Sequence, residues 1–320
     1  MKWLCGILLM LATATAQPAS ASRSDDIAAY QALAQQDLRL AIVGHRLATA
    51  NASFCQRMTR NPGWVLHDKA QYPDATIAQA AFGFRAPVAV STVLPGGAAE
   101  TAGIVTGDGI VAVNGTAISN LPFTGQERAS ARLGKVLDIV ADALDASGRA
   151  DIVLINAQGQ KKVTLAPPAV CASRFWVDTK SVLDAGADGV SVRVTEGLLA
   201  FTSDDDSQLA AIVAHEMAHN LLGHRQRLAD GKSVQKILAT EVEADRLSVW
   251  LMANAGYDTA AALRFAERYG RKTDKGIFSD GTHLRWKNRY RVMQEEIMSM
   301  SQTVMADGLR APPLLTGVSS

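Results

Sequence analysis

Two histidines and a glutamate lie close together in the run His215-Glu216-Met217-Ala218-His219. Since a helix has about 3.6 residues per turn, side chains four positions apart project from one face, and both imidazoles can bind the same metal ion. Histidine nitrogen is a preferred zinc ligand, and catalytic zinc sites combine three protein ligands with a water molecule. The run therefore predicts that His215 and His219 bind zinc, with Glu216 as the general base that takes a proton from water.

The residues around this run predict a buried helix. Ser203 and the acids at positions 204–206 suit a helix start, because the hydroxyl can cap free N–H groups and negative charge is favourable there. Positions 209–222 are then apolar on nearly all sides. Burying two imidazoles and a carboxylate is unfavourable unless they gain partners, and a metal ion provides them. Two core histidines bonded to backbone carbonyls are the alternative.

The third ligand does not follow directly after the motif. Metzincin proteases carry a glycine and a further histidine there, whereas this chain has Leu222 and Arg225 at those positions. A second predicted helix, ending at Gly256, carries Glu241 and, one turn later, Asp245. Because the two acids share a helix face, Glu241 can bind the metal while Asp245 holds a histidine ring from behind. An exposed acidic stripe is the alternative.

His-Glu-Met-Ala-His followed by Glu-Val-Glu-Ala-Asp-Arg resembles the gluzincin family of HtpX-like and CAAX-prenyl endopeptidases. The resemblance implies one zinc ion per chain, bound by His215, His219 and Glu241. It also implies Glu216 as general base and Asp245 as the acid behind the ligands. The expected catalytic domain is mostly helical with a small β-sheet.

Two other polar residues are expected to lie away from the metal. His224 matches a histidine that is frequent in this family, but on a continuous helix it lies about 140° around the axis from His219. It is therefore expected to be structural or on the surface. Glu243 faces away from Glu241 and is expected to be solvated or in an ion pair.

Near the last predicted helix, Thr282-His283-Leu284 and Arg289 resemble a family segment in which proline replaces the leucine. The resemblance implies that His283 and Arg289 lie near zinc and stabilise the oxyanion formed from the peptide carbonyl. Two alternatives stay open. The segment can be a basic surface helix, or His283 can be a fourth metal ligand that holds the protease inactive.

Residues 189–195 alternate between apolar and polar side chains, which predicts a strand half exposed to solvent. In the resembled family such a strand lies at a sheet edge beside the motif helix. An extended substrate can add to it through main-chain hydrogen bonds, which gives broad specificity.

Residues 80–167 resemble a PDZ domain of bacterial proteases. The order of motifs carries the resemblance: a strand over 88–94, Pro95-Gly96-Gly97, a short helix over 98–104, and Gly-Asp-Gly-Ile-Val-Ala-Val-Asn-Gly over 107–115. It implies a groove helix over 129–144 and a loop, Phe82-Gly83-Phe84, whose backbone N–H groups bind a peptide carboxylate. A β-rich subdomain that only braces the catalytic domain is the alternative.

The N-terminus predicts export. Lys2 precedes an apolar run from Trp3 to Ala16, which is too short to span a bilayer about 30 Å thick, and Ala19-Ser20-Ala21 is typical of a signal cleavage site. Residues 1–21 are therefore expected to be a signal peptide cleaved after Ala21, with cleavage after Ala16 or an uncleaved anchor as alternatives. No stable transmembrane anchor is expected in the mature chain.

Cleavage would remove Cys5 and leave Cys55 and Cys171, which an oxidising compartment favours as a disulfide over two buried thiols.

The formal charge of +1 in 320 residues excludes a basic surface for nucleic acid. The expected fold is α+β, with a helical segment over 22–79, the PDZ-like domain over 80–167, the metallopeptidase domain over 168–308 and a flexible tail over 309–320. We expect an exported zinc endopeptidase that cleaves misfolded envelope proteins, recognised in part by exposed C-termini. The alternative is a latent protease or a PDZ scaffold or chaperone with little activity.

Overall fold

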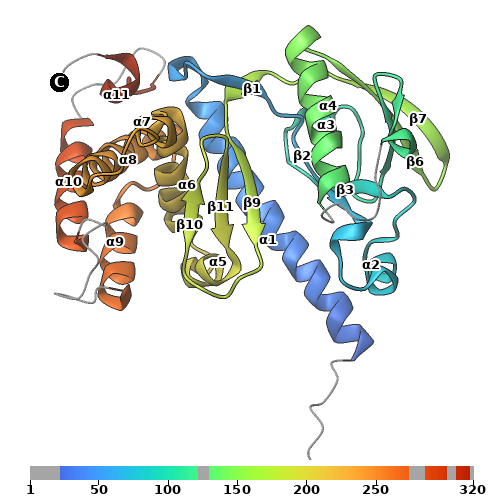
Figure 1. Cartoon of the computed structure of the whole chain (residues 1–320), viewed down its shortest axis with the longest axis horizontal. Coiled ribbons are helices and arrows are strands. Elements are labelled where there is room, and N and C mark those ends of the chain that lie inside the picture. Colours follow the sequence, from blue (N-terminus) through green and yellow to red (C-terminus); the bar gives the residue numbers. More distant parts are fainter. Residues whose placement is uncertain (1–21, 122–129, 274–284, 301–307, 318–320) are drawn as a thin grey trace, which may run out of the picture.

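The computed structural model describes residues 22–121, 130–273, 285–300 and 308–317. Within these ranges the chain folds into a β-rich unit and a mostly helical unit, and the long helix α1 (Arg23–Ala50) runs past both (Figure 1). The fold is α+β, as the sequence predicts. The expected signal peptide over 1–21 and the expected site residue His283 lie outside these ranges.

Helix α1 connects the two units. It starts with a capping box, in which the Ser22 hydroxyl accepts a hydrogen bond from the Asp25 N–H and the Asp25 carboxylate accepts one from the Ser22 N–H. Its N-terminal half contacts α2 (Ala75–Phe82) of the β-rich unit, for example through a hydrogen bond from Gln31 to the Ala81 carbonyl. Its C-terminal half is buried in the core of the helical unit.

The β-rich unit contains an antiparallel sheet with the strand order β2-β3-β4-β6-β7, and β5 pairs with β4. Helix α4 packs on this sheet, and both share one apolar core. The elements expected between residues 88 and 165 are present, but the expected domain start at residue 80 is too late, because strand β2 precedes it. The bounds are β2 (Trp64–Asp68), β3 (Val88–Val93), β4 (Gly109–Val113), β5 (Thr116–Ala117), β6 (Ala150–Asn156), β7 (Gly159–Leu165), α3 (Ala98–Thr101) and α4 (Ala131–Ser147).

The helical unit includes a small sheet with the strand order β10-β11-β9. Strand β11 (Ser191–Thr195) is antiparallel to β10 (Ala185–Ala187) and parallel to β9 (Arg174–Asp178). The prediction that residues 189–195 form an edge strand is therefore wrong, since strands flank β11 on both sides. The edge went unrecognised because Ala-Gly-Ala in β10 has no alternation of apolar and polar side chains.

Helices form most of the rest of this unit, and the most extensive contact between two helices is that of α6 with α8 (Figure 1). Helix α6 starts at Asp206 rather than near Ser203, because the Asp205 carboxylate accepts hydrogen bonds from the Ser207 and Gln208 N–H groups. The bounds are α5 (Glu196–Thr202), α6 (Asp206–Leu221), α7 (His224–Arg227), α8 (Val234–Asn254), α9 (Ala260–Thr273), α10 (Trp286–Met300) and α11 (Pro313–Thr316), with short 3₁₀ turns η1 (Ala52–Phe54), η2 (Lys69–Gln71) and η3 (Ile118–Asn120).

The described part of the expected tail packs on the helical unit. The Arg310 N–H donates to the Asn254 side chain, and Leu314 and Leu315 contact the apolar core. Residues 309–317 are thus packed rather than free. The sequence did not predict this contact, because a short apolar stretch such as Leu314-Leu315 has no periodicity that indicates what it packs against.

In the portion of the chain that the structure describes, no helix is both long and apolar enough to cross a membrane.

The predicted disulfide is confirmed: Cys55 and Cys171 are bonded, with sulfurs 1.99 Å apart. The bridge lies beside the paired strands β1 (Met58–Arg60) and β8 (Ala169–Cys171), where the chain enters and leaves the β-rich unit. The disulfide therefore links the segment that enters the β-rich unit to the segment that leaves it.

Replacing Cys55 and Cys171 together with alanine should lower the free energy of unfolding by about 2 to 4 kcal/mol, because the bridge closes a long loop and so restricts the unfolded chain. Urea unfolding of oxidised wild type and the double variant measures this difference. Reduced wild type is the control and should resemble the variant. An unchanged unfolding midpoint would contradict the prediction.

Candidate active site

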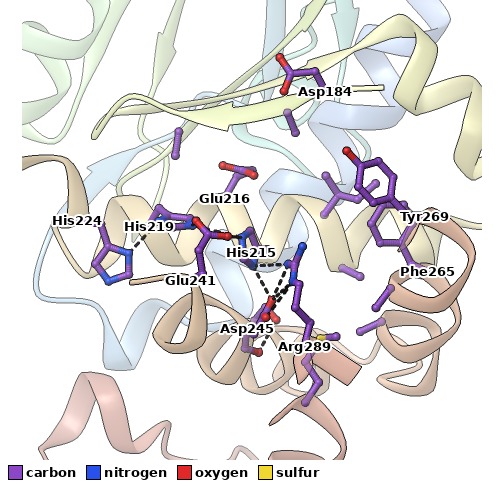
Figure 2. Close-up of a pocket in the computed structure, with 18 of the residues that line it drawn as sticks. Asp184, His215, Glu216, His219, His224, Glu241, Asp245, Phe265, Tyr269 and Arg289 are labelled. Atoms are coloured by element: carbon purple, nitrogen blue, oxygen red, sulfur yellow. Dashed lines mark hydrogen bonds and ion pairs between the residues drawn. The ribbon is translucent and has the colours of Figure 1, made fainter. Parts of the chain in front are cut away.

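The three expected metal ligands converge between helices α6 and α8. His215, His219 and Glu241 each offer a ligand atom, and these atoms lie within 4.8 Å of one another (Figure 2). The two Nε2 atoms are 3.2 Å apart, and each lies 3.5 Å from a Glu241 carboxylate oxygen. Two atoms that each lie about 2.1 Å from a tetrahedral zinc ion are about 3.4 Å apart. The cluster therefore fits one zinc ion.

The surroundings of the two histidines shift their pKa values in opposite directions. Burial lowers the pKa of His219 to about 3, which keeps this ring in the neutral form that a metal requires. Burial would also lower the pKa of His215, but hydrogen bonds to Asp245 and Glu241 outweigh it and raise the value.

Glu216 lies on the pocket side of this cluster (Figure 2). Burial raises the pKa of Glu216, because a charged carboxylate is poorly solvated there. A carboxylate with a raised pKa binds a proton more readily, which suits a general base that later returns the proton as an acid.

Asp245 lies behind His215, as the resemblance implies. Its side chain is 1% exposed, and its Oδ1 atom lies 3.0 Å from His215 Nδ1, so the opposite nitrogen of the ring faces the cluster. Arg289 donates hydrogen bonds to both oxygens of this carboxylate, the shortest from Nη2 at 2.6 Å and from Nε at 2.9 Å. Burial would raise the pKa of Asp245, but the Arg289 charge outweighs it and holds the value well below its usual range.

Arg289 was expected to stabilise an oxyanion, together with His283. In the structure its guanidinium is bonded to Asp245, and Nη2 lies 3.2 Å from His215 Nδ1. These contacts make Arg289 a positioning residue, and the expected contact with an oxyanion stays a prediction. His283 belongs to residues 274–284, outside the described ranges.

Glu243 forms the predicted ion pair, with Arg227, whereas a contact of His224 with His219 was not expected. His224 is 1% exposed rather than on the surface, and its Nδ1 lies 2.8 Å from His219 Nδ1. Its Nε2 lies 2.9 Å from a Glu243 oxygen. Sequence reasoning missed this contact because it assumed a continuous helix, although Gly223 marks the point where the helix ends.

A pocket of about 700 Å³ opens beside the cluster. The edge strand β10 forms one rim, so an added substrate strand would pair there and not with the central strand β11. Helix α9 forms an apolar wall that includes Phe265 and Tyr269 (Figure 2). The Tyr269 hydroxyl donates to the Leu183 carbonyl at 3.3 Å, which ties this wall to the start of β10.

The expected carboxylate loop Phe82-Gly83-Phe84 is not an open cradle. The Gly83 N–H donates to the Gln79 carbonyl at 2.9 Å as the cap of α2, so this donor is already used. Phe84 is 7% exposed and packs with Phe82 against His67. The predicted carboxylate loop is therefore not formed, because Phe84 is buried, Phe82 is partly buried and the Gly83 N–H is already bonded.

Two family comparisons agree with this division of the chain. Residues 74–141 match the PDZ domain family, and residues 173–239 match Peptidase family M48. The chain is similar to an M48 metallopeptidase with a PDZ domain. Peptidases of this family are zinc-dependent in general, which agrees with the His215, His219 and Glu241 cluster.

The peptidase match ends before Glu241, so the third ligand rests on geometry. The two matches do not distinguish the narrower HtpX-like and CAAX-prenyl groups. A comparison with curated proteins gave no match.

Replacing Asp245 with asparagine should lower the free energy of unfolding of chelator-treated protein by about 2 to 3 kcal/mol, because it leaves the Arg289 charge in a buried site without its counter-ion. Urea unfolding measures the change. Glu295→Gln is the matched control, since it breaks an exposed ion pair on α10, the helix that carries Arg289. This variant should change the free energy of unfolding by no more than about 0.5 kcal/mol. Equal effects of the two variants would contradict the prediction.

Proposed function

We propose that the chain is an exported zinc-dependent endopeptidase that cleaves misfolded envelope proteins. The observation that carries the proposal is the convergence of His215, His219 and Glu241 at distances that fit one tetrahedral ion, beside a pocket with Glu216 on its wall. Among the described residues, these three side chains leave one tetrahedral position for water, which supports a catalytic rather than a structural site.

The roles of the side chains follow from their positions. Zinc held by the three ligands would polarise the attacking water and the scissile carbonyl. Glu216 takes the proton of that water and passes it to the leaving amine. Asp245 and Arg289 keep the His215 ring turned with Nε2 toward the cluster.

The shape and lining of the pocket support extended peptides with apolar side chains as substrates. A substrate in extended conformation can add to the β10 edge, where main-chain hydrogen bonds make no demand on side chains. The apolar wall on α9 accepts one large apolar side chain beside Glu216. Misfolded proteins expose both extended backbone and apolar side chains, whereas folded proteins bury them.

The PDZ domain is proposed to bind substrate and raise its concentration near the pocket. Strand β2 is one edge of the sheet, and helix α4 packs against it, so an added peptide strand would lie along β2 rather than at residues 82–84. Export is supported by the Cys55–Cys171 bond, since disulfides persist in oxidising compartments.

Glu216→Gln tests the proposed chemistry. It should reduce casein cleavage by at least about 100-fold, because the amide cannot accept the water proton, while zinc content stays at one ion per chain. Cleavage assays and metal analysis on both proteins measure the two effects. Glu241→Ala is the matched variant and should lose zinc. Cleavage by Glu216→Gln at the wild-type rate would remove this residue from the mechanism, and absence of cleavage by zinc-loaded wild type would favour latency.

Phe265→Ala tests the apolar wall. For peptides with one large apolar side chain near the scissile bond, KM should rise about tenfold with little change in kcat, because the lost contact binds substrate and transition state equally. Trp176→Ala, on the exposed face of strand β9, is the control and should leave KM unchanged. If both variants behave like wild type across a series of apolar and acidic peptides, the wall does not select substrates.

A further inference from the structure

A second row of polar groups lies behind the metal-binding cluster, on the side of His219. His219 Nδ1 lies 2.8 Å from His224 Nδ1, and His224 Nε2 lies 2.9 Å from Glu243 Oε2 (Figure 2 shows the first contact). Arg227 completes the row, with both terminal nitrogens bonded to the Glu243 carboxylate. The row therefore runs from a metal ligand to the protein surface.

A break in the helix brings His224 to this place. Helix α6 ends at Leu221, and Gly223 adopts a left-handed conformation with φ of 65°, which residues other than glycine rarely adopt. The short helix α7 then starts in a new direction and carries both His224 and Arg227. Glu243 comes from α8, two positions after the metal ligand Glu241.

The hydrogen-bond chemistry of this row admits one arrangement for neutral rings. A carboxylate paired with arginine only accepts hydrogen bonds, so His224 must carry its hydrogen on Nε2 and donate it to Glu243. His224 Nδ1 is then an acceptor, and His219 Nδ1 must be the donor. His219 Nε2 is left with a free electron pair directed into the cluster, which is the form that binds a metal.

We propose that His224 and Glu243 are positioning residues that fix the orientation and tautomer of His219 for metal binding, as Asp245 does for His215. The inference rests on the zinc site of the proposed function. Each histidine ligand then has its own carboxylate behind it: Asp245 in direct contact, and Glu243 through the His224 ring.

Burial distinguishes this row from surface ion pairs. The His224 side chain is 2% exposed, so its two ring nitrogens depend on the partners that the protein provides. Loss of the His224 ring would leave His219 Nδ1 without its acceptor and free the His219 ring to rotate or to change tautomer. Removal of such partners behind a metal ligand weakens metal binding about 10- to 100-fold.

The test is the zinc dissociation constant, measured by competition with a chromophoric chelator at fixed pH on the full chain. His224→Phe keeps the ring volume but offers no acceptor, and zinc should bind about 10- to 100-fold more weakly. His224→Asn places an amide oxygen near the former Nδ1 position and should recover most of the affinity. Cobalt-loaded His224→Phe should also show a changed visible absorption spectrum, since the geometry of the ligand shell differs.

Glu243→Gln provides a second variant at a side chain that is 27% exposed, so it does not endanger folding. Its zinc affinity should lie between those of wild type and His224→Phe, because an amide can still bond to His224 but no longer requires one tautomer. Glu267→Gln, which breaks an exposed ion pair on α9, is the control and should bind zinc like wild type. If His224→Phe does not fold, the asparagine and glutamine variants decide.

Zinc affinities of folded His224→Phe and Glu243→Gln within twofold of wild type would overturn the proposal. His215→Ala separates this failure from failure of the zinc site itself. If His215→Ala loses zinc while His224→Phe retains it, only the positioning role is wrong. If neither variant changes zinc binding, the proposed metal site is wrong.

Discussion

The structure depends on the packing of helix α6 against helix α8, because this contact brings polar groups from both helices into one buried place. His215 and His219 come from α6, and Glu241 and Asp245 come from α8. Apolar residues around them, such as Leu209 and Leu247, are fully buried. In such surroundings an imidazole or carboxylate without a partner is costly, so each polar group is matched by another. The proposed metal-binding cluster of His215, His219 and Glu241 is one consequence of this matching.

Two further consequences are the rows of partners behind the histidines. The buried Asp245–Arg289 pair holds His215, and the His224–Glu243–Arg227 row contacts His219. Both rows are anchored by an arginine at the rim of the buried region. Since hydrogen-bond partners behind a ligand fix its orientation, the two rows support a proposed metal site that is formed in advance rather than by the metal.

Strand β10 and helix α9 form the proposed substrate side of the site. Both border the same pocket, and the Tyr269 hydrogen bond to the Leu183 carbonyl links them. Helix α1 contacts both units, and the disulfide joins the segments that enter and leave the β-rich unit. Because Cys55 and Cys171 also pack in the core of the helical unit, the two units are connected at two places. This arrangement supports the proposed delivery of peptide from the β-rich unit to the pocket.

The sequence alone determined the features that depend on local spacing. Four-residue spacing placed His215 with His219 and Glu241 with Asp245, alternation located the strands between residues 88 and 165, and the count of cysteines indicated the disulfide. Tertiary structure decided which segments meet. The helix end at Gly223 allows His224 to contact His219, and packing among aromatic residues buries Phe84. Arg289 forms an ion pair with Asp245, and the short strand β10 lies at the sheet edge. Periodicity records which face of an element is buried, but the partner of that face is set by packing between segments distant in the chain.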